Sequence, residues 1–173
     1  KRPVNLILIG GLSKHYHFDC ANIITQIRDI CLKYPHKQWL LSNSPRTPTE
    51  MNQALTRLSY PNLHIHDYQQ DSFSKTDENL QDILLKTDFT WMTPDSMSMM
   101  FEALSAGSQL GFIDCQPQKQ SRIVRRVENL LHEGYAITLN DTIPAQRHVK
   151  HIPWEADRAA LWLVEQLHSK KLG

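Results

Sequence analysis

The sequence is poor in cysteine, with only Cys20, Cys31 and Cys115 among 173 residues and no C-x-x-C pair. This odd, scattered set argues against a disulfide framework, so we expect reduced thiols in the core and a cytoplasmic location. No apolar run approaches the roughly 18 residues that a membrane span needs, so no transmembrane segment is expected. The two signs of charge almost balance, because the sequence has 19 Lys and Arg and 18 Asp and Glu, a net charge of +1. The sequence therefore predicts no general attraction to nucleic acid or to an anionic membrane.

Common nucleotide and metal motifs are also missing. Gly10 and Gly11 lack the third glycine of G-x-G-x-x-G, and no G-K-[ST] loop is present, which disfavours NAD binding and ATP hydrolysis. The nine histidines include a His15-x-His17 and a His64-x-His66 pair, but the pairs are expected on different loops, with no cysteine partner and no H-E-x-x-H motif. We therefore expect neither a bound metal nor a cofactor.

What the sequence does contain is a regular alternation of apolar runs and amphipathic segments. An apolar content of 40% is that of a globular protein. Strands are expected at residues 4–9, 39–41, 63–66, 89–92, 110–113 and 135–139, and helices at residues 20–34, 47–58, 77–86, 94–107, 120–133 and 154–168. This alternation predicts an α/β fold, a Rossmann-like doubly wound parallel sheet formed as one domain over residues 1–173. Because the first strand begins almost at once and no initiator methionine precedes it, we interpret the chain as a fragment of a longer protein.

Two helix starts carry the same local signal. In Thr47-Pro48-Thr49-Glu50, the threonine fits the N-cap, the proline fits the first helical position, and Glu50 closes a capping box. Thr93-Pro94 repeats the threonine–proline signal before the next long helix. We therefore predict that both helices begin directly at these prolines.

The predicted strand order, 3-2-1-4-5, places a ligand crevice between the first and fourth strands. The loops that leave strands one, two and four are rich in hydroxyls and small residues, and two of them lead into helix N-termini that favour an anion. Lys14 and Arg46 add positive charge, and a guanidinium can hold a phosphate through two hydrogen bonds. The candidate phosphate-binding residues are Gly10, Gly11, Ser13, Lys14, His15, Arg46, Thr47, Asp95, Ser96 and Ser98.

The fourth-strand helix carries one further candidate, Glu102. Helical spacing places Met97, Met100, Phe101 and Leu104 on one face, and Asp95, Ser98 and Glu102 on the opposite face. A carboxylate there can accept two hydrogen bonds from a ribose diol. The alternative interpretation is an ordinary solvated helix face.

Three segments together resemble one family. They are Gly-Gly-x-Ser-Lys-His at 10–15, S-x-R-T-P at 44–48 and T-x-D-S-x-S-M-x-x-E-A-L-x-x-G at 93–107. They are similar to the plant mitochondrial-fission "elongated mitochondria" family and its bacterial homologues, over most of residues 4–115. That family resembles GT-B glycosyltransferases, in which two Rossmann-like domains face each other and the second binds a nucleotide sugar. The resemblance implies that Glu102 meets the ribose, that Ser96 and Ser98 lie near the diphosphate, and that this chain is the C-terminal, donor-binding half.

Two functions remain open at this stage. The first is the nucleotide-sugar-binding half of a glycosyltransferase or of a related GT-B epimerase, with the N-terminal domain as its partner. The second is an adaptor that retains the fold without catalysis, as in relatives that act in organelle division. No catalytic residue can be named, because the base of a GT-B enzyme usually comes from the other domain. We therefore expect the isolated chain to bind its ligand without turnover.

Overall fold

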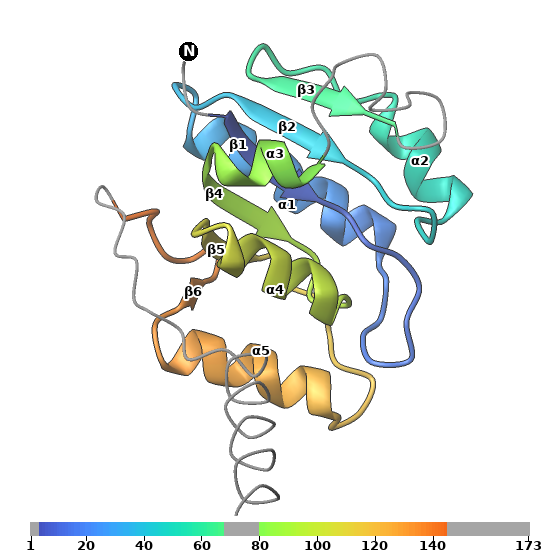
Figure 1. The fold of residues 1–173 in the computed structure, drawn as a ribbon. Coiled ribbons are helices and arrows are strands. Elements are labelled where there is room, and N and C mark those ends of the chain that lie inside the picture. The colour runs from blue at the N-terminus through green and yellow to red at the C-terminus, as the bar shows by residue number, and fades with distance from the viewer. Residues whose placement is uncertain (1–3, 68–79, 145–173) are drawn as a thin grey trace, which may run out of the picture.

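The computed structural model describes residues 4–67 and 80–144. Within them the chain forms a six-stranded sheet in the order β3-β2-β1-β4-β5-β6, and every neighbouring pair is parallel (Figure 1). The strands are β1 Val4–Leu8, β2 Trp39–Ser42, β3 Leu63–His66, β4 Thr87–Met92, β5 Gln109–Phe112 and β6 Ala136–Ile137. This arrangement confirms the Rossmann-like α/β fold and the strand order expected from the sequence.

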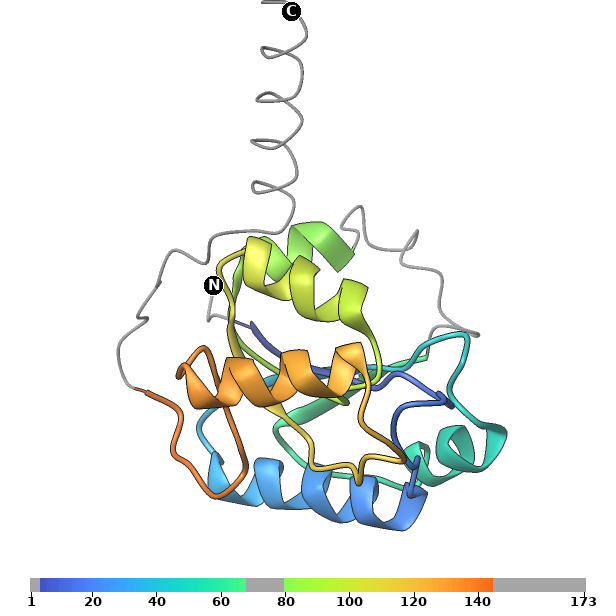
Figure 2. The same cartoon turned by 90° about the horizontal axis from the view of Figure 1, so that it is seen from below.

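Helices connect the strands and cover the sheet. They are α1 Cys20–Lys33, α2 Thr49–Leu55, α3 Leu80–Leu85, α4 Met97–Ser105 and α5 Arg122–His132. Figure 2 shows α1 and α2 on one side of the sheet and α3 and α4 on the other, and Figure 1 shows α5 beyond the β6 edge. The helix expected at 154–168, and the first residues of the one expected at 77–86, lie outside the described residues. No helix in the described ranges is long and apolar enough to cross a membrane.

The centre of the core is β1, which pairs with β2 on one side and β4 on the other. Its apolar run is buried on both faces, with Leu6 and Ile7 completely inaccessible, as the continuous hydrophobicity of the segment predicts. Trp91 of β4 is also fully buried and packs against Gly111 of β5, where a Cβ atom would collide with the indole ring. All three cysteines are free thiols, with Cys31 and Cys115 buried and Cys20 half-buried.

The last strand is shorter than the 135–139 expected. Pairing stops after Ile137 because the chain turns at the next residue. The backbone N–H and the hydroxyl of Thr138 both donate to Oδ2 of Asp141, at 2.8 and 2.9 Å, and the Asp141 N–H donates back to the Thr138 carbonyl. These bonds lower the pKa of the Asp141 carboxyl below its usual value. A local turn thus takes the N–H group that a longer strand would have used.

Both predicted threonine caps are wrong. Helix α2 begins at Thr49 with Pro48 at its N-cap position and no side-chain cap, and Glu50 therefore closes no capping box with Thr47. Helix α4 begins at Met97, where the hydroxyl of Ser96 accepts the Met99 N–H at 3.4 Å. Each helix starts later than expected because the threonine that follows the strand forms hydrogen bonds with the loop after β1 instead.

Candidate functional site

The candidate site lies where β1 and β4 diverge, at the carboxyl edge of the sheet. The loop after β1 is bonded to the loop after β4, because the Gly10 N–H donates to the Thr93 hydroxyl at 2.8 Å and the Gly11 N–H donates to Asp95 Oδ2 at 3.1 Å. On the other side of β1, the Thr47 hydroxyl accepts the Ser44 N–H at 2.9 Å and donates to the Gly10 carbonyl. Three exit loops therefore meet at the glycine pair.

The two glycines are required for this close approach. A Cβ atom on Gly10 would collide with the Asp95 carboxylate, and one on Gly11 would collide with the backbone carbonyl of Arg46. The sequence analysis placed both glycines among the candidate phosphate-binding residues. In the structure both N–H groups are bound within the protein, so the glycines serve the site by letting neighbouring loops reach one another.

The sequence analysis predicted Asp95 on the exposed face of the helix, and this prediction is wrong. Asp95 precedes α4, and its side chain is only 3% exposed. Its Oδ2 accepts bonds from the Gly11 N–H and from Arg46 Nη2, both at 3.1 Å. Its Oδ1 is buried, and no donor in the described ranges reaches it. The carboxylate is stabilised in this buried position by an N–H group and a cation, the two partners a buried charge needs.

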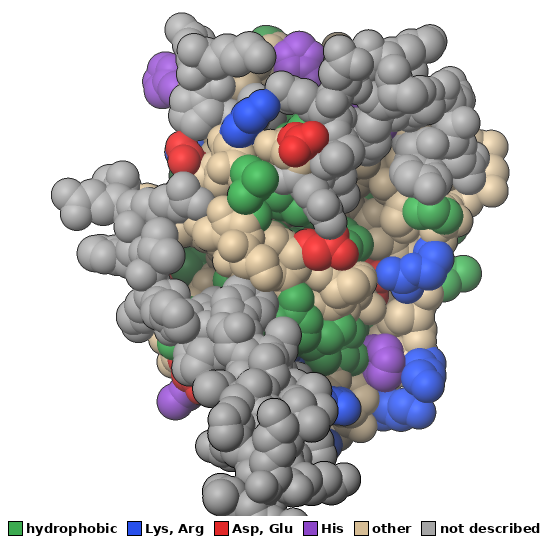
Figure 3. All heavy atoms as spheres, in the orientation of Figure 1, with side chains coloured by type: hydrophobic (Ala, Val, Ile, Leu, Met, Phe, Trp, Pro, Cys, Tyr) green, Lys and Arg blue, Asp and Glu red, His purple; other side chains and the backbone are tan. Residues whose placement is uncertain are grey.

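Arg46 is held at the edge of the site by this bond. Its side chain is 48% exposed, and a guanidinium carries five N–H donors, of which Asp95 engages one nitrogen. Lys14, in the loop after β1, is exposed to solvent. Most of the Lys and Arg side chains visible in Figure 3 gather on the side toward which β1, β2 and β4 point in Figure 1. Positively charged side chains are therefore concentrated at the carboxyl edge of the sheet.

The predicted exposure of Ser98 and Glu102 on α4 is confirmed. Both side chains are exposed and stand four residues apart, whereas Met100 is buried against the sheet. The Ser96 hydroxyl, besides capping the helix, lies 3.2 Å from the hydroxyl of Ser98. This end of α4 thus offers a helix N-terminus with the exposed hydroxyl of Ser98 and, one turn further on, the exposed carboxylate of Glu102, whereas Ser96 is buried.

The remaining predicted residues of the first loop, Ser13 and His15, shape that loop. The Ser13 hydroxyl accepts the N–H groups of His15 and Tyr16, each at 3.2 Å. His15 Nδ1 lies 3.0 Å from the hydroxyl of Ser121, which caps α5 by accepting the Val124 N–H at 3.3 Å. The sequence analysis did not identify Ser121, although a serine directly before the apolar spacing of α5 is a recognisable cap signal.

The same loop is also hydrogen-bonded to the loop that follows β5. The His17 N–H donates to the Gln116 carbonyl at 2.9 Å, and the Gln118 N–H donates to the His15 carbonyl at 2.8 Å. The Gln118 side chain adds a bond to the Tyr16 carbonyl at 3.0 Å. Burial raises the pKa of the Tyr16 hydroxyl, and the negative charge of Glu128 raises it further, so the phenol stays protonated.

Metal-binding side chains do not gather in the described ranges. No group of three or more His, Cys, Asp or Glu side chains comes together there. The His15-x-His17 and His64-x-His66 pairs therefore find no third ligand among those residues.

The sheet order and the position of the loops define a Rossmann-like α/β protein with its candidate site at the topological switch point. A family model described as "Mitochondrial fission ELM1" matches residues 1–167. The chain belongs to this family.

Comparison with solved structures finds a similar fold in a UDP-GlcNAc 2-epimerase from Neisseria meningitidis, crystallised with UDP-GlcNAc. The two share 16% sequence identity and a TM-score of 0.39 over 77% of this chain. The match covers 37% of the epimerase, so the chain spans little more than a third of that enzyme's length. No curated protein matches the sequence.

Proposed function

We propose that this chain binds a nucleoside diphosphate sugar where the loops after β1, β2 and β4 meet, and that it is the donor-binding half of a GT-B-like protein. The observation that carries the proposal is the accessible face at the start of α4. The exposed Ser98 presents a hydroxyl beside a helix N-terminus, which favours a diphosphate, and Glu102 lies one turn further along the same face. The buried Ser96 caps this helix, and its hydroxyl lies 3.2 Å from that of Ser98.

Arg46 supports the same function from the neighbouring loop. Its bond to Asp95, the residue directly before Ser96, places its guanidinium beside the start of α4. The N–H groups not used by Asp95 can donate to phosphate oxygens, and the exposed Lys14 adds charge. Glu102 can then accept both hydroxyls of the ribose. The segments 10–15, 44–48 and 93–107, which resemble the mitochondrial-fission family, contain the residues used in this assignment.

Ligand binding is tested first by thermal unfolding of the 173-residue chain with UDP-, GDP-, ADP- and CMP-sugars. A ligand at 100 times its Kd adds about 2.7 kcal/mol of apparent stability. Stabilisation by one nucleotide class supports the proposal. Absence of a shift with every nucleotide contradicts it and favours an adaptor that retains the fold, which the family's association with organelle fission accommodates.

The role of Glu102 is then tested by calorimetric titration with the nucleotide that binds. Glu102→Ala should lower affinity roughly ten- to hundredfold, because charge-assisted bonds to a ribose diol are worth about 1.5–3 kcal/mol. The affinity of Glu102→Gln should lie between those of the wild type and Glu102→Ala, since an amide oxygen still accepts a hydrogen bond from one hydroxyl. Stability should change by less than about 0.5 kcal/mol, because the side chain is exposed. The matched control is Asp88→Ala, an exposed acid near the amino end of β4, at the opposite edge of the sheet.

A further inference from the structure

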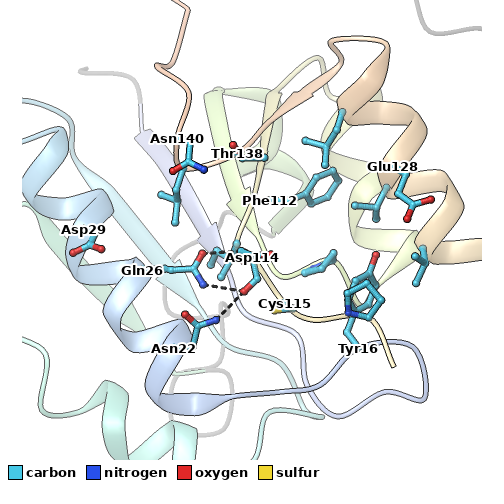
Figure 4. A pocket seen from close by; sticks show the side chains of 17 residues that line it. Tyr16, Asn22, Gln26, Asp29, Phe112, Asp114, Cys115, Glu128, Thr138 and Asn140 are labelled. Carbon is cyan, nitrogen blue, oxygen red and sulfur yellow. Dashed lines mark hydrogen bonds between the residues drawn. The ribbon is translucent and has the colours of Figure 1, made fainter. Parts of the chain in front are cut away.

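A cavity lies between α1 and α5, and its lining includes Pro94 of the loop after β4. Its volume is about 540 Å³, within the range of small-molecule sites. Figure 4 shows α1 along one side, α5 along the other and the end of β5 between them. We call it the α1–α5 pocket. None of the residues assigned to the nucleotide site lines it.

The α1–α5 pocket has an apolar wall. Five side chains from β5, α5 and the segment after β6 supply it, namely Phe112, Val124, Val127, Leu131 and Leu139. Phe112, Val124 and Val127 are buried and belong to the main hydrophobic core. This wall can cover the hydrocarbon part of a ligand and stabilise it by removing apolar surface from water.

Two of the three amide side chains that line the pocket, Asn22 and Gln26, are hydrogen-bonded to the protein itself; the third is Asn140. Gln26 donates to the Asp114 carbonyl at 2.9 Å and accepts the Asp114 N–H at 2.7 Å, and Asn22 donates to the same carbonyl at 3.1 Å. These bonds are the dashed lines in Figure 4. These bonds direct Asn22 and Gln26 at the backbone of Asp114, and the side-chain carboxylates of Asp29, Asp114 and Glu128 remain as the charged acceptors of the lining.

The charges on the rim all have one sign. Asp29, Asp114 and Glu128 line the pocket, and its lining contains no Lys, Arg or His among the described residues. Asp29 forms an ion pair with Arg28, but both side chains are about half exposed, so solvent screens that pair. Lys33 lies beside the rim, with its ammonium group bound to the backbone carbonyls of Leu139 and Asp141. The charged side chains that line the pocket are therefore all acidic and border an apolar wall, and the ammonium group of Lys33 stands next to them.

Two buried groups respond to this negative charge. Burial is the main reason that the pKa of the Cys115 thiol rises to about 12, and Asp95 and Asp114 raise it further. Burial and then Glu128 raise the pKa of Tyr16. Both groups stay protonated at neutral pH, so neither adds an anion to the pocket.

We propose that the α1–α5 pocket binds a small organic cation, an ammonium or amidinium group carried on an aromatic or aliphatic body. The carboxylates of Asp29, Asp114 and Glu128 face the cation, and the wall that includes Phe112 and Val127 covers the apolar body. This site prefers the opposite charge from the edge that carries Lys14 and Arg46. The proposal does not depend on nucleotide binding.

Two probes of similar size and opposite charge test the charge preference. Tryptamine and indole-3-propionate are each titrated into the ¹⁵N-labelled 173-residue chain at low ionic strength, and amide shifts are followed by NMR. Tryptamine should bind at least about tenfold more tightly, with its largest shifts around Gln26, Asp114 and Glu128. Equal affinities, shifts centred elsewhere or absence of binding by both probes would overturn the proposal.

Variants of the exposed Glu128 test whether tryptamine binds in the α1–α5 pocket. Glu128→Lys should weaken tryptamine binding about tenfold, and Glu128→Gln about threefold, because the first reverses the charge and the second removes it. Asp88→Lys makes the same charge reversal at an exposed strand position outside the pocket and should leave the affinity within twofold. Should Glu128→Lys fail to fold, Glu128→Gln and Asp114→Asn decide the question. A response of Asp88→Lys equal to that of the Glu128 variants would assign the effect to net charge and reject the site.

Discussion

Asp95 Oδ2 lies 3.1 Å from Nη2 of Arg46, and the same oxygen accepts the Gly11 N–H. One carboxylate oxygen thereby joins the loops that leave β4, β2 and β1, three neighbouring strands of the sheet. The carboxylate is buried and the guanidinium half exposed, so the bond holds a solvent-accessible cation against a fixed internal anion.

Asp95→Ala should destabilise the fold by about 1–3 kcal/mol. The change leaves the Gly11 N–H without its acceptor and Arg46 without its anion, and an unpaired buried polar group has a penalty of this size. Urea denaturation measures the loss. Asp29→Ala is the control, because it removes an acid from an exposed ion pair and should change stability by less than about 1 kcal/mol. Equal losses in the two variants would contradict a structural role for the Asp95 bonds.

Gly11→Ala should destabilise more than Gly10→Ala. The added methyl on Gly11 meets the backbone of Arg46, which cannot turn aside, whereas the methyl on Gly10 meets the Asp95 side chain. Overpacking of a well-packed site reduces stability by about 1–3 kcal/mol, and we expect Gly11→Ala at the upper end. Thermal and chemical unfolding of both variants gives the order. Ser59→Ala, at an exposed position, serves as the reference for a change without a steric clash.

Stability should decrease as the pH rises above about 9. Burial raises the pKa of Cys115 from 9.0 to about 12 and that of Cys31 from 9.0 to about 11. In this range the unfolded chain releases thiol protons that the folded chain retains, so the contribution is complete below pH 9 and is lost as pH approaches the folded values. Urea denaturation between pH 8 and about 10.5 measures the slope. Cys115→Ala should reduce that slope, and an unchanged slope would show that this thiol ionises equally in both states.

Ser121→Ala should weaken the start of α5 and its contact with the first loop. The Ser121 hydroxyl accepts the Val124 N–H and lies 3.0 Å from His15 Nδ1. Loss of a serine cap reduces stability by about 1 kcal/mol. Ser121→Asp should restore most of this loss, because aspartate also caps a helix. Equal stabilities of the alanine and aspartate variants, measured by urea denaturation, would show that capping at this position contributes little.

The fold could be predicted because its signals are local. The apolar run of β1 and the spacing of apolar residues in α1 and α5 reflect burial that each segment shows by itself. Short connections between strands and helices then leave few topologies, and the observed order is the expected one with β6 added beside β5.

The site was harder to predict because its bonds link distant parts of the sequence. Thr47 and Thr93 carry a good helix-cap signal, yet both bind Gly10, at separations of 37 and 83 residues. The sequence pattern assigns Asp95 to an exposed helix face, because it cannot show that the Asp95 carboxylate occupies the space left by the missing side chain of Gly10. By contrast, the exposure of Ser98 and Glu102 followed from helical spacing alone and was predicted correctly.

The central position of β1 has a consequence during synthesis of the protein. β1 precedes both of its partners in the chain, and one of them, β4, begins only at Thr87, so one edge of β1 has no partner until that segment leaves the ribosome. An apolar strand with an open edge is a template for pairing with other chains. Ribosome-bound or prematurely released fragments that end before β4 should therefore be the species of this protein most prone to aggregate and most dependent on chaperones.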